Sequence, residues 1–153
     1  MQLRVRALTW EAEDILGIEL VPLERGASLP PFDAGAHVEL HLPNGLVRSY
    51  SLVNAPGERH RYVVAVGRDR ASRGGSRWLH DSLRVGTVLE VDAPRNQFAL
   101  DEAAPASVLI AGGIGVTPLV AMAHRLAALG RPWTMHVAAR SRAHAAFIDT
   151  LRA

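Results

Sequence analysis

Four polar residues stand together in a short apolar stretch at the end of the first third of the chain, Arg48-Ser49-Tyr50-Ser51, directly before Leu52. A flavin is one ligand that would use all of them. Tyr50 offers a flat face to the isoalloxazine ring, Ser51 a hydrogen bond near its reactive edge, and Arg48 a fixed charge for the phosphate. The motif is short, so its meaning depends on the elements that position it.

A second stretch with chemical potential runs from Ala111 to Pro118 and reads AGGIGVTP. It follows a short apolar run and precedes a helical pattern, and unpaired N–H groups at a helix start favour an anion. Gly112, Gly113 and Gly115 would let a pyrophosphate approach the backbone. The stretch lacks the Lys of a triphosphate-binding loop and the Gly-x-Gly-x-x-Gly spacing of the dinucleotide fingerprint. A glycine-rich turn without a ligand is the alternative.

A third stretch, Gly74-Gly75-Ser76, repeats this logic on a smaller scale. We expect a short helix to begin here with Ser76 as its N-cap. Arg73 and Arg77 lie beside the glycines and would suit a phosphate dianion. The alternative is a capped surface turn, and a hydrolase nucleophile is disfavoured because Ser76 lacks the Gly-x-Ser-x-Gly elbow.

Residues 1–102 are expected to hold short strands separated by Gly, Pro and Asn turns. Leu3 to Leu8 alternates apolar and polar residues, which is typical of a half-buried strand. Asn44-Gly45 predicts a tight hairpin, because both residues tolerate positive φ. The expected strands are 3–8, 15–21, 38–42, 47–53, 61–66 and 87–92. This pattern predicts a closed antiparallel barrel.

Residues 103–153 change to a β-α-β-α pattern, which indicates a second, α/β domain. We expect a strand at 107–111 and another at 133–139. The helix between them should be capped by Thr117, with Pro118 in its first position and Gly130 at its end. Ser141 is expected to cap a final helix that runs through Leu151.

The composition excludes several classes of protein. All 17 basic residues are Arg, they are interleaved with 15 acids, and Cys is absent. This disfavours nucleic-acid binding and excludes disulfides, thiolate zinc sites and iron–sulfur ligation within the chain. His37 and His41 could share a strand face, but with no evident Cys or carboxylate partner no metal site is expected. Trp78 is expected to pack under the barrel. With no long apolar run or signal peptide, we expect a cytoplasmic protein that does not bind membranes.

The three stretches occur in an order and spacing that resemble the ferredoxin–NADP reductase superfamily. Within it, the chain is most similar to the reductase components of phthalate dioxygenase and vanillate demethylase. Pro43-Asn44-Gly45 before the first motif, and Ala139-Arg140-Ser141, add to the similarity. The resemblance implies a six-stranded antiparallel flavin-binding barrel, followed by the start of a Rossmann-like lobe that binds a nicotinamide nucleotide.

The resemblance also assigns roles to residues. Ser51 would lie near flavin N5 as the catalytic residue, and Arg140 and Ser141 would approach the ribose or phosphate of NADH or NADPH. FMN is favoured over FAD, because those relatives bind FMN and Arg73 and Arg77 would compensate a terminal phosphate. The full set implied for cofactor binding is Arg48, Ser49, Tyr50, Ser51, Val66, Gly67, Gly74, Gly75, Ser76, Gly112, Gly113, Gly115, Thr117, Arg140 and Ser141.

The implied activity is that of a reductase component, which passes electrons from a nicotinamide nucleotide through FMN to an oxygenase partner or iron–sulfur acceptor. The alternative is a flavin-binding module without nicotinamide turnover. Because the chain ends at Ala153 after two strands of the expected lobe, we expect it to be a piece of a longer protein. If it is complete, we expect a homodimer or partner chain to cover the open sheet edge.

Overall fold

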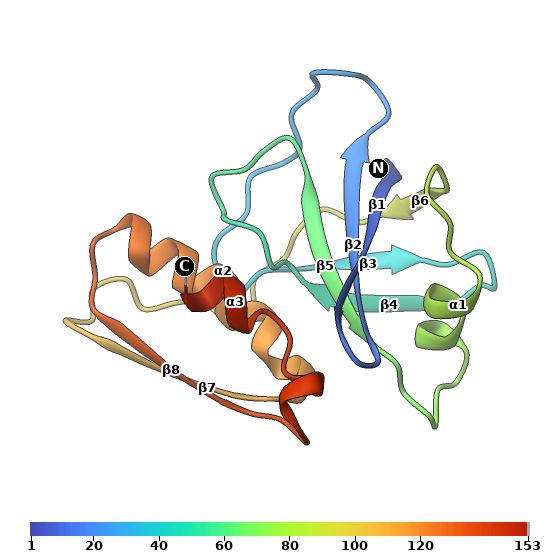
Figure 1. Cartoon of the computed structure of the whole chain (residues 1–153). Coiled ribbons are helices and arrows are strands. Elements are labelled where there is room, and N and C mark those ends of the chain that lie inside the picture. Colours follow the sequence, from blue (N-terminus) through green and yellow to red (C-terminus); the bar gives the residue numbers. More distant parts are fainter. Residues whose placement is uncertain (153) are drawn as a thin grey trace.

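The computed structural model describes residues 1–152 and contains six antiparallel strands followed by a smaller α/β lobe (Figure 1). The strands span Gln2–Ala12 (β1), Ile15–Pro22 (β2), His37–His41 (β3), Val47–Ser51 (β4), Tyr62–Gly67 (β5) and Val88–Val91 (β6). Their spatial order is β4-β3-β6-β1-β2-β5, and an antiparallel bridge between Leu52 and Val64 joins the two ends. The sheet therefore closes on itself, which confirms the predicted barrel.

The hairpin of β3 and β4 follows from its sequence pattern. Val38 and Leu40 are fully buried in the barrel, while the residues that alternate with them are only partly buried. The Asn44-Gly45 turn then reverses the chain, with Gly45 at a φ of 80° and its N–H donating to the Leu42 carbonyl at 2.9 Å. The register of this hairpin fixes the face that each polar residue of β4 occupies.

A short helix, α1 (Gly75–Asp81), lies against the barrel, and Leu79 and Trp78 pack on the barrel core as expected for Trp78. The prediction that Ser76 caps this helix is wrong. The residue before α1 is Gly74, at a φ of 110°, and Ser76 lies inside the first turn. Because glycine adopts this backbone conformation without steric cost, the chain turns at Gly74 and the helix starts directly after it.

The second lobe contains two parallel strands, β7 (Ser107–Gly112) and β8 (Trp133–Ala138), joined through a 3-10 turn, η1 (Gly113–Gly115), and a helix, α2 (Val116–Ala128). This confirms the predicted β-α-β order. The predicted domain boundary at 102/103 falls between β6 and β7, and it stays a prediction. Within residues 1–152, no helix has the length and apolar content that crossing a bilayer requires.

The predicted start of α2 is wrong, whereas its predicted end is confirmed. The η1 turn continues into the helix at Val116, so Thr117 and Pro118 occupy its second and third positions. Thr117 is buried and its hydroxyl donates to the Ile114 carbonyl at 3.0 Å, so it stabilises the turn. Gly130 adopts a φ of 64° just beyond the helix, as a C-terminal glycine does.

The predicted final helix is interrupted. A 3-10 turn, η2 (Arg142–His144), follows Ser141, and the helix α3 (Ile148–Arg152) begins only after Phe147. Phe147 has a φ of 63°, which a helix interior does not allow, and it is buried between barrel and lobe. Burial of this ring therefore outweighs the local helical pattern.

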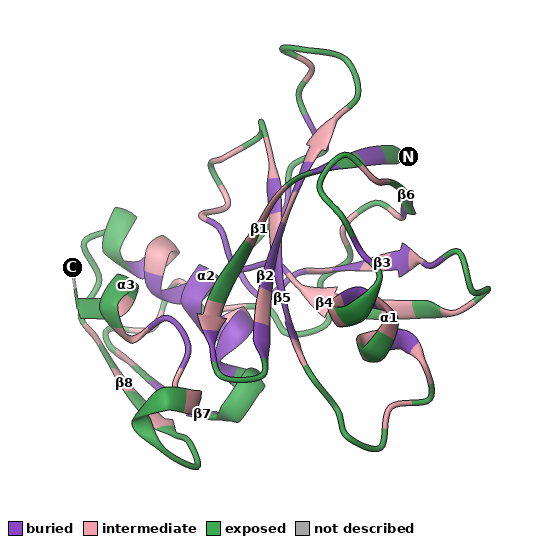
Figure 2. Ribbon diagram, turned by 45° about the vertical axis from the view of Figure 1, so that its right-hand side comes forward, coloured by how far each residue is buried: buried purple, intermediate pink, exposed green. Residues whose placement is uncertain are grey.

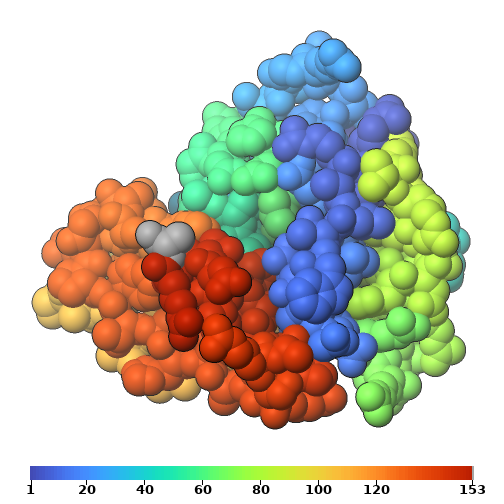
Figure 3. Space-filling view, viewed as in Figure 1, coloured from blue at the N-terminus to red at the C-terminus, as the bar shows by residue number. Residues whose placement is uncertain are grey.

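Barrel and lobe share one hydrophobic cluster. Figure 2 shows α2 largely buried between the barrel and the β7–β8 pair. In Figure 3 the C-terminal segment lies against the hairpin of β1 and β2, where the Glu13 N–H donates to the Ala143 carbonyl at 2.8 Å. Barrel residues Ala12, Ile15, Ala34, Val53 and Ala65 pack with lobe residues such as Leu109, Val116, Val120, Met122 and Phe147. This packing fixes how the motifs of the two parts face each other.

The outer face of the β7–β8 pair is open. Val108 and Ile110 are 65% and 75% exposed, on the face opposite α2. Parallel sheets are normally covered on both faces, so a covering element is expected here. The homodimer predicted to cover the open edge of this sheet stays a prediction.

Glu19 joins two arginines on the barrel surface and offers a test of barrel stability. Arg6 and Arg61 both donate to its carboxylate, Arg61 at 2.9 Å. Burial raises the pKa of Glu19, but the hydrogen bonds from the two arginines outweigh it and hold this pKa below its ordinary value of 4.5. Such a group stabilises the fold above its unfolded-state pKa and ceases to do so as pH falls through the folded-state pKa.

We therefore expect Glu19→Gln to lower the Tm at neutral pH, and to make the Tm less sensitive to acid below the ordinary pKa of 4.5. Calorimetry across this pH range measures both effects. Glu24→Gln, at an exposed site in the loop after β2, is the control. Equal Tm values for Glu19→Gln and the parent protein at neutral pH would contradict the prediction.

Candidate functional site

The strand β4 divides the Arg48–Ser51 motif between its two faces. Leu40 pairs with Arg48 and His37 pairs with Ser51 in the register with β3. Because side chains alternate along a strand, Arg48 and Tyr50 share one face, while Ser49 and Ser51 share the other. In the sheet order β4 and β5 are the two end strands, joined at the Leu52–Val64 bridge. We call the boundary between β4 and β5 on the side of this bridge where Tyr50 and Val66 lie the seam.

Tyr50 and Val66 flank the seam, since each lies two residues from the bridge on its own strand. Tyr50 is half-buried and Val66 is buried. Burial raises the pKa of the Tyr50 hydroxyl, and the charge of Arg48 opposes this only in part, so the phenol is neutral at physiological pH. A neutral, half-buried aromatic ring beside the seam is suited to stack on a flat ligand.

Arg48, the first residue of the motif, contacts the Gly74-Gly75 turn at the start of α1. A Cβ atom on Gly75 would lie 2.9 Å from Nε of Arg48, so the arginine side chain covers this glycine. The Asn44 side-chain amide donates to the Gly74 carbonyl at 3.4 Å, which ties the β3–β4 turn to the start of α1. The structure therefore brings together two stretches that the sequence only placed in order. Ser76 is half-buried there, and its hydroxyl accepts a hydrogen bond from the Asp69 N–H at 3.3 Å.

The other end of α1 is tied to β5. His80 Nε2 lies 2.9 Å from the Val66 carbonyl, so this nitrogen carries the proton and donates it. Arg68, just after β5, pairs with Asp81 at 2.6 Å. The helix is therefore held on both sides of the seam. His80 was not identified from the sequence, because its partner lies on another element.

The glycine turn of the lobe approaches the barrel through Ile114. A Cβ atom on Gly67 would lie 3.5 Å from Cβ of Ile114, so the end of β5 and η1 are in contact. Gly112, Gly113 and Gly115 are exposed, and an added Cβ atom would meet nothing within 4 Å at any of them. Their backbone is therefore accessible to a ligand.

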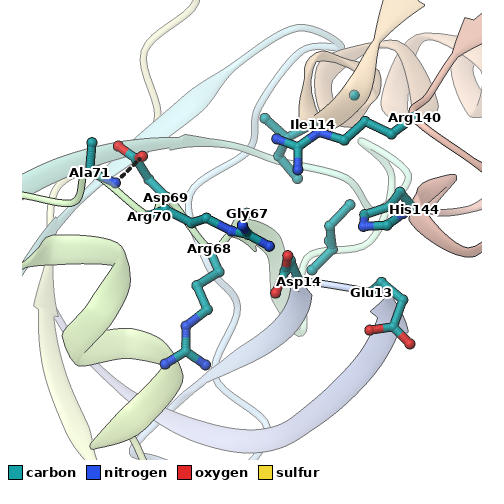
Figure 4. A pocket seen from close by; sticks show the side chains of 12 residues that line it. Glu13, Asp14, Gly67, Arg68, Asp69, Arg70, Ala71, Ile114, Arg140 and His144 are labelled. Atoms are coloured by element: carbon teal, nitrogen blue, oxygen red, sulfur yellow. Dashed lines mark hydrogen bonds between the residues drawn. The ribbon is translucent and has the colours of Figure 1, made fainter.

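A cavity of about 420 Å³ lies between barrel and lobe (Figure 4). Three predicted binding residues line it, namely Gly67, Gly113 and Arg140, and in Figure 4 the Arg140 side chain extends toward Ile114. Its volume falls within the range of small-molecule sites. Six charged or titratable residues that the sequence had not marked also line it: Glu13, Asp14, Arg68, Asp69, Arg70 and His144. They come from three separate segments, and no local pattern connects them.

Ser141 and Ser51 lie outside this lining. The Ser141 hydroxyl contacts Nδ1 of His144 at 2.9 Å. Ser49 and Ser51 line a separate hollow of about 320 Å³ on the outer face of β4. The other residues around that hollow, which we call the Ser51 hollow, are Gly35, His37, Gln97 and Phe98. The predicted site residues therefore lie around the seam, the cavity between barrel and lobe, and the Ser51 hollow, rather than in one pocket.

The two histidines of β3 have different surroundings. His41 Nε2 lies 3.0 Å from a carboxylate oxygen of Asp92, a partner 51 positions away that the sequence analysis had missed. The hydrogen bond with His41 holds the pKa of the Asp92 carboxyl below its ordinary value. Within residues 1–152, no group of three or more His, Cys, Asp or Glu residues is placed to hold a metal ion.

Comparison with known proteins returned no matching family model but several similar sequences. The chain is 57% identical over 152 residues to the phenoxybenzoate dioxygenase subunit beta of Ectopseudomonas oleovorans, covering 99% of this chain and 47% of that protein. It is 47% identical over 148 residues to a vanillate O-demethylase oxidoreductase of Pseudomonas sp., covering 97% of this chain and 46% of that protein.

Among solved structures, the chain is similar to phthalate dioxygenase reductase with a TM-score of 0.95 and 43% identity. The match covers 100% of this chain and 48% of that one. That protein is described as a modular structure for electron transfer from pyridine nucleotides to a 2Fe–2S centre. The chain thus spans about half the length of the relatives that it matches.

Proposed function

The chain belongs to the ferredoxin–NADP reductase superfamily, together with reductase components of oxygenase systems, and from this premise we propose that it is the flavin-binding part of such a reductase. It would bind FMN in preference to FAD and accept a hydride from NADH or NADPH. Electrons would then pass to an oxygenase partner, through an iron–sulfur acceptor. The proposal rests chiefly on the meeting of Arg48, Gly75 and Tyr50 along the seam.

The residues at the seam fit a flavin with a terminal phosphate. Gly75 has no side chain where Nε of Arg48 crosses it, so the arginine lies against the start of α1, while its Nη1 donates to the Val47 carbonyl at 2.8 Å. The Ser72 hydroxyl accepts hydrogen bonds from the N–H groups of Gly74 and Arg77, at 3.1 and 3.4 Å, so the N–H groups of Gly75 and Ser76, together with Arg48, would hold a phosphate dianion. Tyr50 would stack on the isoalloxazine ring. β4 is an end strand of the sheet, and the ring would have to extend along its edge to meet Ser51, whose side chain lies on the other face.

A bound flavin supplies the chemistry itself, accepting a hydride and releasing electrons one at a time. The chain's residues position and tune it. Arg48 places a positive charge near the cofactor, and Val66 and Gly67 border the seam from β5, where His80 fixes the Val66 carbonyl. Hydride transfer needs no side-chain base.

The nicotinamide nucleotide would enter from the lobe. Its phosphates would approach the exposed Gly112, Gly113 and Gly115 backbone, and Arg140 in the adjoining cavity would meet its ribose or phosphate. Thr117 would act indirectly, since its hydroxyl holds the turn through Ile114. The Gly67–Ile114 contact would keep this path next to the flavin ring.

Flavin binding and reduction test the proposal. Adding the chain to FMN should quench flavin fluorescence with a stoichiometry of one, and anaerobic NADH or NADPH should then bleach the visible flavin absorption. Dithionite shows independently that the bound flavin can be reduced. Failure to retain any flavin would overturn the proposal. Binding without bleaching by either nucleotide would favour the alternative, a flavin-binding module without nicotinamide turnover.

A further inference from the structure

A hollow on the outer face of β1 and β2 lies at the end of the barrel away from the seam. It meets β2 at Val21, near the end of that strand, whereas Val66 at the seam pairs with Leu16 near its start. In Figure 1 the loop after β2 stands at the top of the barrel, away from the lobe. The hollow, which we call the Arg4 hollow, is surrounded by Arg4 of β1, the loop 23–28, His60 and the turn at Val85.

The Arg4 hollow is separate from the places where the flavin and the nucleotide are proposed to bind. Among the described residues, it shares none of its lining with the cavity between barrel and lobe or with the Ser51 hollow. Its volume is about 770 Å³, which falls within the range of small-molecule sites. A ligand here would therefore leave the proposed flavin site free.

Backbone hydrogen bonds fix both sides of the Arg4 hollow. On one side, the Val5 N–H donates to the Thr87 carbonyl at 2.9 Å, and the Gly86 N–H donates to the Val5 carbonyl at 2.8 Å. On the other side, the Leu29 N–H donates to the Arg59 carbonyl at 2.7 Å. The Arg59 guanidinium donates back to the Leu29 carbonyl at 3.0 and 3.1 Å. A hollow held in this way needs little ordering when a ligand binds.

Positive charge exceeds negative charge in the Arg4 hollow. The basic residues that line it are Arg4, Arg6, Arg25 and His60. Among its lining residues, all within the described part of the chain, Glu24 has the one carboxylate. Arg6 pairs with Glu19, but Arg4 and Arg25 form no ion pair within residues 1–152, and both are exposed. Two guanidinium groups are therefore available to an anion from solvent.

Apolar side chains stand beside these cations. Leu23 is 43% exposed and Val85 is 61% exposed, and the half-buried Val21 and Pro22 line the same hollow. A simple inorganic anion would leave this apolar surface in water. An organic acid with an apolar body would cover it while its carboxylate met the guanidinium groups.

We propose that the Arg4 hollow is a binding site for a small organic acid with an apolar body. The carboxylate pairs with Arg4 and Arg25, and the apolar body lies against Leu23 and Val85. The proposal does not depend on flavin binding, since no residue assigned to the flavin lines this hollow. Glu24 opposes the ligand, because it places a like charge in the same hollow.

An NMR titration with benzoate as the probe tests the proposal, with excess FMN present so that a phosphate site elsewhere is occupied. Benzoate should shift the backbone signals of the loop 23–28 and of Val85 in a saturable manner. Acetate lacks the apolar body and benzyl alcohol lacks the charge, so each should bind at least about tenfold more weakly. Raising the NaCl concentration should weaken benzoate binding, because salt screens exposed charges.

Variants of opposite charge locate the site. Arg4→Gln and Arg25→Gln should each weaken benzoate binding by about two- to fivefold, as expected for exposed ion pairs. Glu24→Gln should tighten it by a similar factor, a gain that damage to the fold cannot produce. Arg131→Gln, at an exposed site after α2, is the control and should bind benzoate like the parent.

Three results would overturn the proposal. They are benzoate shifts that lie outside the Arg4 hollow, benzoate affinity unchanged in both arginine variants, and tighter binding of hexaglutamate than of benzoate. The last result would assign the hollow to an acidic segment of a protein partner instead. Failure of the protein to bind FMN would contradict the proposed function and leave the benzoate titration as decisive as before.

Discussion

Replacing Arg48 by alanine should weaken FMN binding by about 10- to 100-fold and leave riboflavin binding nearly unchanged, because riboflavin lacks the phosphate. Arg48 lies against Gly75, at the start of α1, where the proposed phosphate site is. A hydrogen bond to a charged group contributes about 1.5–3 kcal/mol, and about 1.4 kcal/mol corresponds to a tenfold change in affinity. Quenching of flavin fluorescence in parallel titrations with both ligands measures the effect.

The comparison of the two ligands separates a phosphate contact from a structural role. Arg25→Ala removes an equal charge from the exposed loop after β2 and should change neither affinity. If Arg48→Ala weakened FMN and riboflavin equally, Arg48 would be supporting the hairpin rather than holding the phosphate. If it bound FMN as tightly as the parent, Arg48 would have no place in the site.

The barrel could be predicted because its signals are local. The alternation along β3 and the Asn44-Gly45 turn depend on neighbours in the sequence, and both appear in the structure, although only Gly45 and not Asn44 takes a positive φ. The helix starts could not be predicted as well, because tertiary contacts decide them. Thr117 is buried at the second position of α2 instead of capping the helix. Phe147 is buried at a positive φ, so the helix predicted from Ser141 is interrupted there.

The site could be predicted as motifs but not as an arrangement. The order of the three motifs suggested their roles, yet only the fold brings Arg48 onto Gly75 and Ile114 onto Gly67. The division of Ser51 from Arg48 follows from strand alternation, which the sequence does contain. What the sequence does not contain is the pairing partner. His37 opposite Ser51 and Asp92 beside His41 depend on register and on strand order around the barrel.

Replacing Gly35 by alanine should cause the largest loss of stability. The segment 92–106, which links the barrel strand β6 to the lobe strand β7, passes directly over this residue. Gly35 has a φ of 95°, and an added Cβ atom would lie 1.9 Å from the Phe98 carbonyl oxygen and 2.9 Å from Cε of Met122. The Met122 side chain can move, but the Phe98 backbone cannot move alone, since the Asn96 amide ties this link to the Ala34 carbonyl at 3.1 Å. One of the two backbone segments must therefore shift.

Two costs add in Gly35→Ala. A side chain at positive φ costs about 1–2 kcal/mol, and overpacking against backbone about 1–3 kcal/mol more. At about 2–4 °C per kcal/mol for a chain of this size, we expect calorimetry to show a Tm lower by roughly 5–15 °C. Gly26→Ala is the matched control, because Gly26 also has positive φ, 80°, with nothing within 4 Å of an added Cβ atom. Equal losses in the two variants would mean that the close approach of Phe98 has no energetic weight. A larger loss in Gly35→Ala would show that this contact fixes the link, and with it the wall of the Ser51 hollow that Gln97 and Phe98 form.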